Sequence, residues 1–156
     1  MITLDNPTTN ACFGCGPANA RGLHLAFSRD GDAVVCEYTP KPDETGWPGL
    51  FHTGLLLLVL NEACFWGAWE LSGAVATLKG PSSFEIHRVP RVGVPFGVRA
   101  TMEKGTGPAM RMKATAETAE GKPVATLDAG FEHLARSRVA KAGLALPDYV
   151  LRDMVP

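Results

Sequence analysis

Apolar residues are concentrated in one long stretch near the middle of the chain. The segment 53–72 contains no proline and only two glycines, Gly54 and Gly67, and leucine, valine, alanine, phenylalanine and tryptophan fall on almost every side of a helical projection. This pattern predicts one long helix that ends at Gly73, a residue type that favours helix C-termini. Because the segment is apolar on all sides, we expect the helix to be buried on all sides.

Strand-like patterns occur both before and after this helix. Before it, His24 to Ser28 and Ala33 to Thr39 flank an Asp-Gly pair, which is a good signal for a hairpin. After it, four further strand-like segments are separated by turn signals, and they comprise residues 84–89, 96–103, 111–118 and 124–133. The order of elements predicts an α+β fold in which a curved antiparallel sheet wraps around the helix.

The chain has 156 residues, which fits a single domain with one core. Proline, asparagine and glycine occur without periodicity in residues 1–20, where we expect an irregular N-terminal arm. Residues 136–156 form a C-terminal extension with one short helix predicted near residues 148–154. One domain over 1–156 is therefore expected.

Charge and hydropathy exclude several classes of partner. Charged residues are 20% of the chain and the net charge is −1, so no general surface for nucleic acid or anionic membrane is expected. The first residues lack the pattern of a secretory signal. The longest unbroken apolar run, Leu55 to Leu60, is much shorter than the roughly 20 residues of a membrane span. We therefore expect a soluble cytoplasmic protein.

Four cysteines are present, and only Cys12 and Cys15 form a close pair. A structural zinc site usually takes four convergent ligands, often from two such pairs. The pair also lacks the strand-to-helix context of a redox-active motif. The simpler interpretation is a tight glycine-rich turn with half-buried thiols, so we predict no metal site and no cofactor.

Three sequence segments carry a resemblance to a known family. They are Cys-Phe-Gly-Cys-Gly-Pro at 12–17 with Arg-Gly-Leu-His-Leu at 21–25, Trp-Pro-Gly-Leu-Phe-His-Thr-Gly at 47–54 with Leu-Asn-Glu-Ala at 60–63, and Arg-Val-Pro-Arg-Val-Gly at 88–93. Together they resemble the hotdog-fold acyl-CoA thioesterases of the PaaI-like and 4-hydroxybenzoyl-CoA type. The resemblance implies a hotdog fold with about five or six strands. It also implies hydrolysis of an acyl-CoA with an aryl or a short to medium acyl group.

Two positions depart from the family pattern. Thr53 stands where the family usually has a glycine after the histidine, and Asn61 stands where these enzymes usually carry a catalytic Asp or Glu. The start of a helix offers unpaired N–H groups, so the N–H of Thr53 or Gly54 is a candidate donor to the thioester oxygen. Asn61 is able to orient water but unable to act as a base. Glu62 is the neighbouring carboxylate, and burial would suit it to general-base work.

Other roles for the acidic residues stay open at this point. Glu62 could instead tie down N–H groups of neighbouring loops, in a protein with weak or no hydrolase activity. Another carboxylate, Glu70 or Glu85, could serve as the base. Asn61 lies eight residues beyond Thr53, about 12 Å along a helix, so one chain cannot easily bring both to one carbonyl. Two antiparallel helices across a two-fold axis can, which predicts a site shared in a homodimer or a dimer of dimers.

Candidate substrate-binding residues surround this core. His52 would orient the thioester or be held by the backbone. By resemblance, the phosphates of CoA would meet the cations, and the first strand after the helix would supply a hydroxyl; the candidates are Arg88, Arg91, Lys104, Arg111, Ser82 and Ser83. Phe65, Trp66 and Trp69 would line an acyl pocket or belong to the core.

Three functions are consistent with these residues. The first is an acyl-CoA thioester hydrolase that uses Asn61, Glu62, Thr53 and Gly54. The second is a hotdog protein that binds acyl-CoA without hydrolysing it, because Asn61 replaces the usual acid. A hydratase on the same fold is weaker, because no Asp-His or His-Glu pair has a familiar spacing. The acyl carrier, CoA or acyl-carrier protein, stays open.

Overall fold

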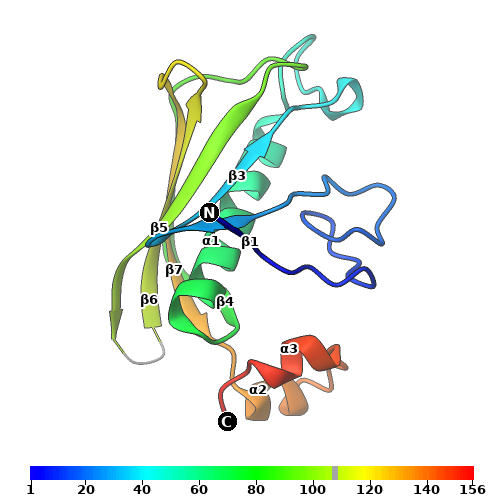
Figure 1. Cartoon of the computed structure of the whole chain (residues 1–156), viewed down its shortest axis with the longest axis vertical. Helices are drawn as coiled ribbons and strands as arrows, with labels where there is room; N and C mark the ends of the chain where they lie inside the picture. Colours follow the sequence, from blue (N-terminus) through cyan, green and yellow to red (C-terminus); the bar gives the residue numbers. More distant parts are fainter. Residues whose placement is uncertain (107–108) are drawn as a thin grey trace.

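One long helix lies along one face of an antiparallel sheet (Figure 1). The computed structural model describes residues 1–106 and 109–156, with the side chains of 104–106 outside the described part. Seven strands follow the order β1-β2-β3-β5-β6-β7-β4 in the sheet. They are β1 (Ile2–Thr3), β2 (Ser28–Asp30), β3 (Ala33–Tyr38), β4 (Ala76–Ile86), β5 (Phe96–Thr106), β6 (Ala109–Thr118) and β7 (Pro123–His133). The α+β prediction is confirmed, with slightly more strands than expected because β1 and β2 add two short ones.

The central helix α1 spans Thr53–Ser72, as predicted. His52 occupies the N-cap, and its ring accepts a hydrogen bond from the Gly54 N–H. At the other end Gly73 adopts a left-handed conformation, with φ of 76°, and donates its N–H to the Trp69 carbonyl. A residue with a side chain would be strained there, which explains why the helix stops at this glycine.

The prediction that α1 is buried on all sides is wrong for a single chain. Its middle part is mostly buried, and Gly67 approaches the sheet so closely that a Cβ would lie 2.8 Å from the Met112 side chain. Near the N-terminus, however, Thr53 and Gly54 are exposed and Leu57 keeps 37% of its surface. One sheet covers only one side of a helix, so another side of α1 remains uncovered. By length and composition α1 could also cross a membrane, but half of its most apolar window is buried within this fold.

Two predicted strands have different bounds in the structure. The hairpin is confirmed, but β2 starts at Ser28 rather than His24, whose φ is 55°. Strand β4 begins at Ala76, so the expected long connection before residue 84 is mostly strand. Gly80 (φ of 98°) lies in an irregularity between Leu78 and Ser82, which lets the strand continue past Pro81. Pro81 is tolerated because β4 is an edge strand, where a missing N–H breaks no ladder.

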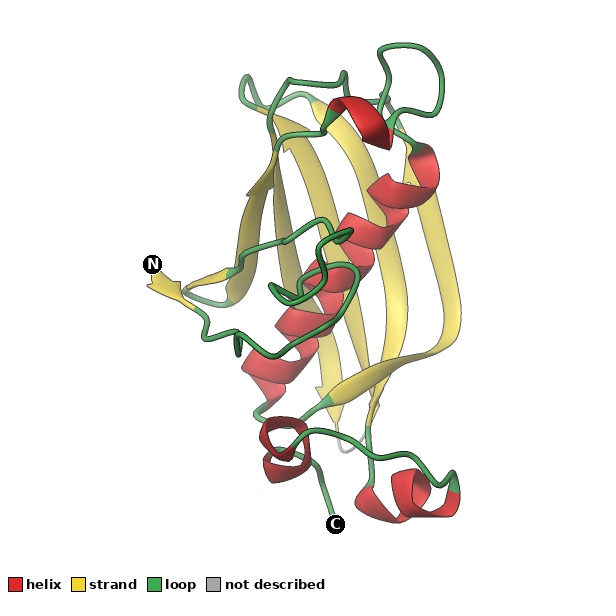
Figure 2. Ribbon diagram, turned by 90° about the vertical axis from the view of Figure 1, so that its right-hand side faces the viewer, coloured by secondary structure: helices red, strands yellow, loops and turns green. Residues whose placement is uncertain are grey.

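The two terminal segments pack on the helix rather than on the main sheet. Residues 4–27 contain no described strand or helix, and Figure 2 shows this arm crossing α1 on the side away from the sheet. The C-terminal extension forms α2 (Arg136–Lys141), which was not predicted, and α3 (Asp148–Arg152), which was. Val75, Val139 and Met154 form a second small core beneath these helices. Both termini therefore approach the same helix, and a cavity lies between them.

Candidate active site

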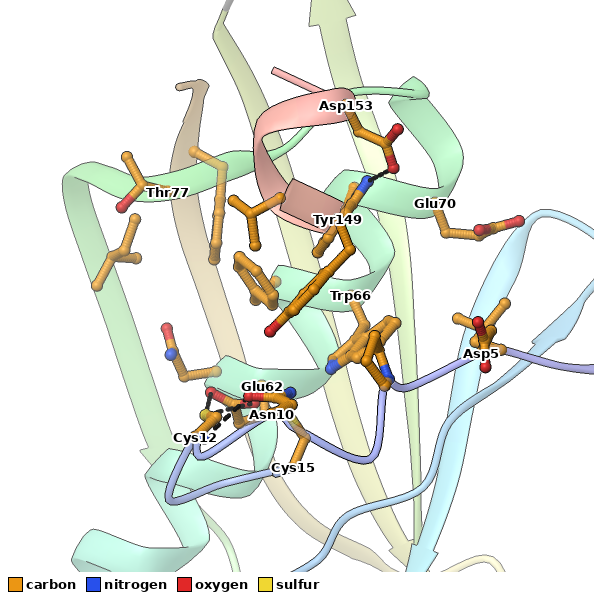
Figure 3. Close-up of a pocket in the computed structure, with 18 of the residues that line it drawn as sticks. Asp5, Asn10, Cys12, Cys15, Glu62, Trp66, Glu70, Thr77, Tyr149 and Asp153 are labelled. Carbon is orange, nitrogen blue, oxygen red and sulfur yellow. Dashed lines mark hydrogen bonds between the residues drawn. The ribbon is translucent and has the colours of Figure 1, made fainter. Parts of the chain in front are cut away.

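A cavity of about 550 Å³ opens between the N-terminal arm, α1, β4 and α3 (Figure 3). The residues of α1 that line it are Asn61, Glu62, Phe65, Trp66, Trp69 and Glu70, and opposite them lie Cys12, Cys15, Thr77, Leu78, Phe131, Tyr149 and Asp153. This volume is in the range of sites for small molecules. The structure therefore places both predicted central residues, Asn61 and Glu62, in one cavity.

One wall of the cavity is aromatic. The rings of Trp66 and Trp69 stack with centroids 5.8 Å apart, and Phe65 meets Trp69 edge-on at 5.8 Å. Trp69 is fixed by its indole N–H, which donates to Asp153 Oδ2 at 3.2 Å. The three predicted pocket residues thus line the cavity, and they offer a broad apolar surface for an acyl group.

The carboxyl group of Glu62 lies at the floor of this cavity, where only 8% of the residue is exposed. The thiol of Cys12 lies 3.7 Å from each carboxylate oxygen. Burial, and secondarily the negative charge of Cys12, raises the pKa of Glu62 to about 7. A carboxyl group with this pKa exchanges a proton readily near neutral pH.

The predicted glycine-rich turn is confirmed, and it packs directly onto Glu62. The Gly16 N–H donates to the Cys12 carbonyl at 2.9 Å, which closes the turn. At Gly14 an added Cβ would lie 2.5 Å from Glu62 Cδ, so only glycine fits against this side chain. A hydrogen bond from the Cys15 thiol holds the pKa of Cys12 well below its usual range, and the same contact raises the pKa of Cys15.

Asn61 lines the same cavity beside Glu62. Its Oδ1 atom is buried and has no hydrogen-bond partner among the residues that the structure describes. A buried amide oxygen without a partner costs free energy. The group is therefore available to a ligand, to water or to a second chain.

The first turn of α1 lies outside this cavity. The Gly54 N–H donates to His52 Nδ1 at 3.0 Å, so it is already occupied and the prediction of a free donor at Gly54 is not supported. The Thr53 N–H makes no hydrogen bond to another described residue. Neither Thr53 nor His52 lines the cavity. Within one chain, the helix start and Glu62 are separate, as the spacing argument required.

The predicted binders of CoA also lie outside the cavity. Ser82 and Ser83 are exposed on β4, and Arg88 and Arg91 are exposed in the segment that follows it. The backbone of Lys104 pairs with Arg111 across β5 and β6, and its side chain is outside the described part. Arg111, the fourth candidate cation, forms an ion pair with Asp128.

The two alternative carboxylates differ in position. Glu70 lines the cavity, but it pairs with Arg29 at 3.1 Å and lies two helical turns beyond Glu62. Glu85 is exposed on β4 and does not line the cavity. Of the three predicted carboxylates, Glu62 has the surroundings most suitable for a general base.

Sequence reasoning missed the contributions of both termini. Cys12 and Asn10 reach the cavity from the arm, and Tyr149 and Asp153 reach it from the C-terminal extension. The pair Cys12 and Glu62 is separated by 50 residues. No spacing rule detects such a contact.

Comparison with solved structures identifies the fold. The structure of RHA08564, a thioesterase superfamily protein, aligns with a TM-score of 0.70 and 22% identity over 80% of this chain and 64% of that one. The chain has the hotdog fold. The Escherichia coli PaaI protein from the phenylacetic acid degradation operon aligns with a TM-score of 0.68 and 15% identity, over 76% of this chain and 85% of that one.

A third similar structure contains a ligand. The protein smu.793 from Streptococcus mutans, bound to acetyl CoA, aligns with a TM-score of 0.63 and 12% identity, over 69% of this chain and 86% of that one. No protein-family profile and no curated protein matches the sequence. The predicted hotdog fold is confirmed by these structures.

Proposed function

We propose that this protein hydrolyses the thioester bond of an acyl-CoA with an aryl or another compact apolar acyl group. The observation that carries the proposal is the buried carboxyl group of Glu62 at the floor of a cavity with an aromatic wall. Further support comes from the acetyl CoA bound to the similar protein of Streptococcus mutans. The stacked indoles of Trp66 and Trp69 favour a flat acyl group.

The proposed reaction uses Glu62 as general base. A water molecule attacks the thioester carbon while Glu62 takes a proton from it, so a C–O bond forms and the C–S bond breaks. The same proton then passes from Glu62 to the departing CoA thiolate, and a carboxylic acid is released. Asn61, whose Oδ1 lacks a partner among described residues, would hold the water by accepting its second proton in a hydrogen bond.

A donor for the carbonyl oxygen would come from a second subunit. The Thr53 N–H, at the start of α1, makes no hydrogen bond to another described residue, and the N-terminal end of a helix stabilises negative charge. It lies about 12 Å from Asn61 along one helix. In an antiparallel pair of helices, Thr53 of the partner subunit would approach Asn61 instead.

Two exposed surfaces support a homodimer. Strand β4 forms one edge of the sheet, and no other described strand pairs with its outer side. Leu78 and Ile86 on this strand are 50% and 40% exposed. A long exposed edge strand with apolar side chains tends to pair with another strand. Two β4 strands joined by a two-fold axis would make one continuous sheet.

The uncovered side of α1 lies next to this edge in the proposed dimer. Gly54, Leu57 and Asn61 recur at helical spacing and lie on one stripe. Burying the exposed part of Leu57 against its symmetry mate would complete the core that a single sheet leaves open. The exposed residues Ser82, Ser83, Arg88 and Arg91 would then flank the seam, where they could bind the phosphates of CoA.

A second candidate function is acyl-CoA binding without hydrolysis. It is favoured by Asn61 at the position of the usual acid and by the arm that packs on Glu62. The contact between Cys12 and Glu62, at 3.7 Å, would hold the carboxyl group away from a substrate water. In that case the cavity would retain the acyl group without supplying a base.

A panel of CoA esters distinguishes the two functions. Thiol release is measured with benzoyl-, phenylacetyl-, hexanoyl- and acetyl-CoA, and binding of each ester is measured by calorimetry. The proposal predicts turnover that is fastest with the aryl esters. Tight binding without thiol release from any ester would support the binding protein and contradict the hydrolase.

A further inference from the structure

We propose that Cys12, Cys15 and Glu62 bind a zinc ion. One ligand atom from each residue lies within 4.8 Å of the other two, and both cysteines are free thiols. Figure 3 shows the three side chains meeting at the floor of the cavity. The prediction of no metal site counted only cysteine pairs, and the third ligand comes from α1, 50 residues after Cys12.

The separations agree with a zinc coordination shell. Zinc binds a thiolate at about 2.3 Å and a carboxylate oxygen at about 2.0 Å, so two such ligands of a tetrahedral ion lie about 3.5 Å apart. The distance from Cys12 Sγ to each Glu62 oxygen is 3.7 Å. The Cys12–Glu62 pair therefore lies within a few tenths of an ångström of tetrahedral spacing.

N–H groups of neighbouring residues point toward the sulfur atoms and hold the turn in shape. Asn10 Nδ2 donates to Cys15 Sγ at 3.6 Å, and Asn10 Oδ1 accepts the Cys12 N–H at 2.9 Å. The Trp66 Nε1 atom is buried and makes no regular hydrogen bond to a described residue. It lies near enough to the Cys15 sulfur to favour the thiolate form of that side chain. Outer hydrogen bonds of this kind orient metal ligands and stabilise thiolates.

The three ligands leave one coordination position open. Cys12, Cys15 and Glu62 all line the cavity, so the fourth position would face it and take water or a group of the ligand. Three protein ligands with one open position are typical of catalytic zinc rather than of structural zinc. Two thiolates with one carboxylate favour zinc over magnesium or calcium, which prefer oxygen ligands.

This inference is independent of the proposed hydrolase, because its readout is metal content. When zinc is bound, Glu62 is a ligand; in the metal-free cavity the same carboxylate is the base proposed above. Zinc binding, together with no thiol release by the metal-free protein, would overturn the proposed function and leave the zinc site standing. Thiol release by a protein that binds no zinc would overturn the zinc site and leave the proposed function standing.

The full-length protein, purified with a reducing agent, is equilibrated with zinc, and the bound metal is measured by atomic emission. We expect one zinc ion per chain in the unchanged protein and in Cys36→Ala, a control at a buried cysteine elsewhere in the core. Cys12→Ser and Cys15→Ser should lose the ion, and Glu62→Gln should raise its Kd at least about tenfold. Circular dichroism confirms that each variant is folded.

Cobalt provides a second readout that does not depend on retention of zinc. Co²⁺ added to the unchanged protein should give the intense near-ultraviolet absorption of cobalt–thiolate bonds, and Cys15→Ser should reduce it strongly. The proposal is overturned if the unchanged protein holds no more zinc than the Cys12→Ser/Cys15→Ser double variant. It is equally overturned if cobalt gives no thiolate absorption.

Discussion

Replacing Glu62 with glutamine should change how the stability of the protein depends on pH. The pKa of this carboxyl group is raised from 4.5 to about 7, mainly by burial. Between these two pH values the folded state keeps a proton that the unfolded chain has released. The free energy of unfolding therefore falls as pH rises through this window, by about 3 kcal/mol in total from this one group. Glutamine has nearly the same shape and does not titrate.

The difference between the two proteins isolates this contribution. Urea unfolding of metal-free protein, with a chelator present, is measured from about pH 4 to about pH 8. The rest of the chain is identical in the two proteins, so the contributions of groups remote from residue 62 cancel in the difference. We expect the stability of Glu62→Gln relative to the unchanged protein to rise by about 3 kcal/mol across the range.

A control variant shows whether the loss of another carboxylate from this cavity would change the pH dependence of stability in the same way. Glu70→Gln removes a carboxylate that lines the same cavity and pairs with Arg29. If the relative stability of Glu62→Gln is constant with pH, or if Glu70→Gln behaves in the same way, the electrostatic account of the cavity floor is refuted.

Three further substitutions test separate parts of the structure. Gly14→Ala would place a Cβ 2.5 Å from the carboxyl carbon of Glu62 and should lower the melting temperature by about 2–8 °C. Gly97→Ala is the control, because its Cβ would meet no atom within 4 Å and the melting temperature should not fall. Equal melting temperatures of the two variants would contradict the packing of the arm on Glu62. Asn61→Asp introduces a carboxylate next to Glu62, as the resemblance implies for active thioesterases, and should raise kcat for thiol release at least about tenfold; an unchanged or lower kcat would show that this side chain does not face the thioester. Leu57→Glu should convert the dimer to a monomer in size-exclusion chromatography, whereas the control Leu144→Glu, at a more exposed leucine, should not. If the unchanged protein is a monomer, the proposal of an active site shared between two subunits is contradicted.

The sequence predicted those parts of the fold that depend on local pattern. The bounds of α1 were correct because its start and its end at Gly73 are marked by neighbouring residues. Strand β4 was predicted eight residues too late, because Gly80 and Pro81 interrupt the alternation. An edge strand accepts both residues through an irregularity in pairing, and local pattern does not show which strand is at the edge.

The candidate site was only partly predictable. Asn61 and Glu62 were found from their position on an apolar helix, since polar residues there need a reason. Their surroundings depend on contacts between distant segments. Cys12 meets Glu62 across 50 residues, and Asp153 meets Trp69 across 84. The sequence shows which residues carry chemistry, but the packing of the two termini decides which of them meet.

The steady-state rate of thiol release from an aryl-CoA, compared between the unchanged protein and Glu62→Gln after removal of metal from both, tests the central claim most directly. Because a general base contributes at least about 100-fold, kcat/KM should fall at least about 100-fold in the variant while the affinity for the CoA ester is retained. Equal turnover in the two proteins would contradict the claim that the buried carboxyl group carries out the reaction.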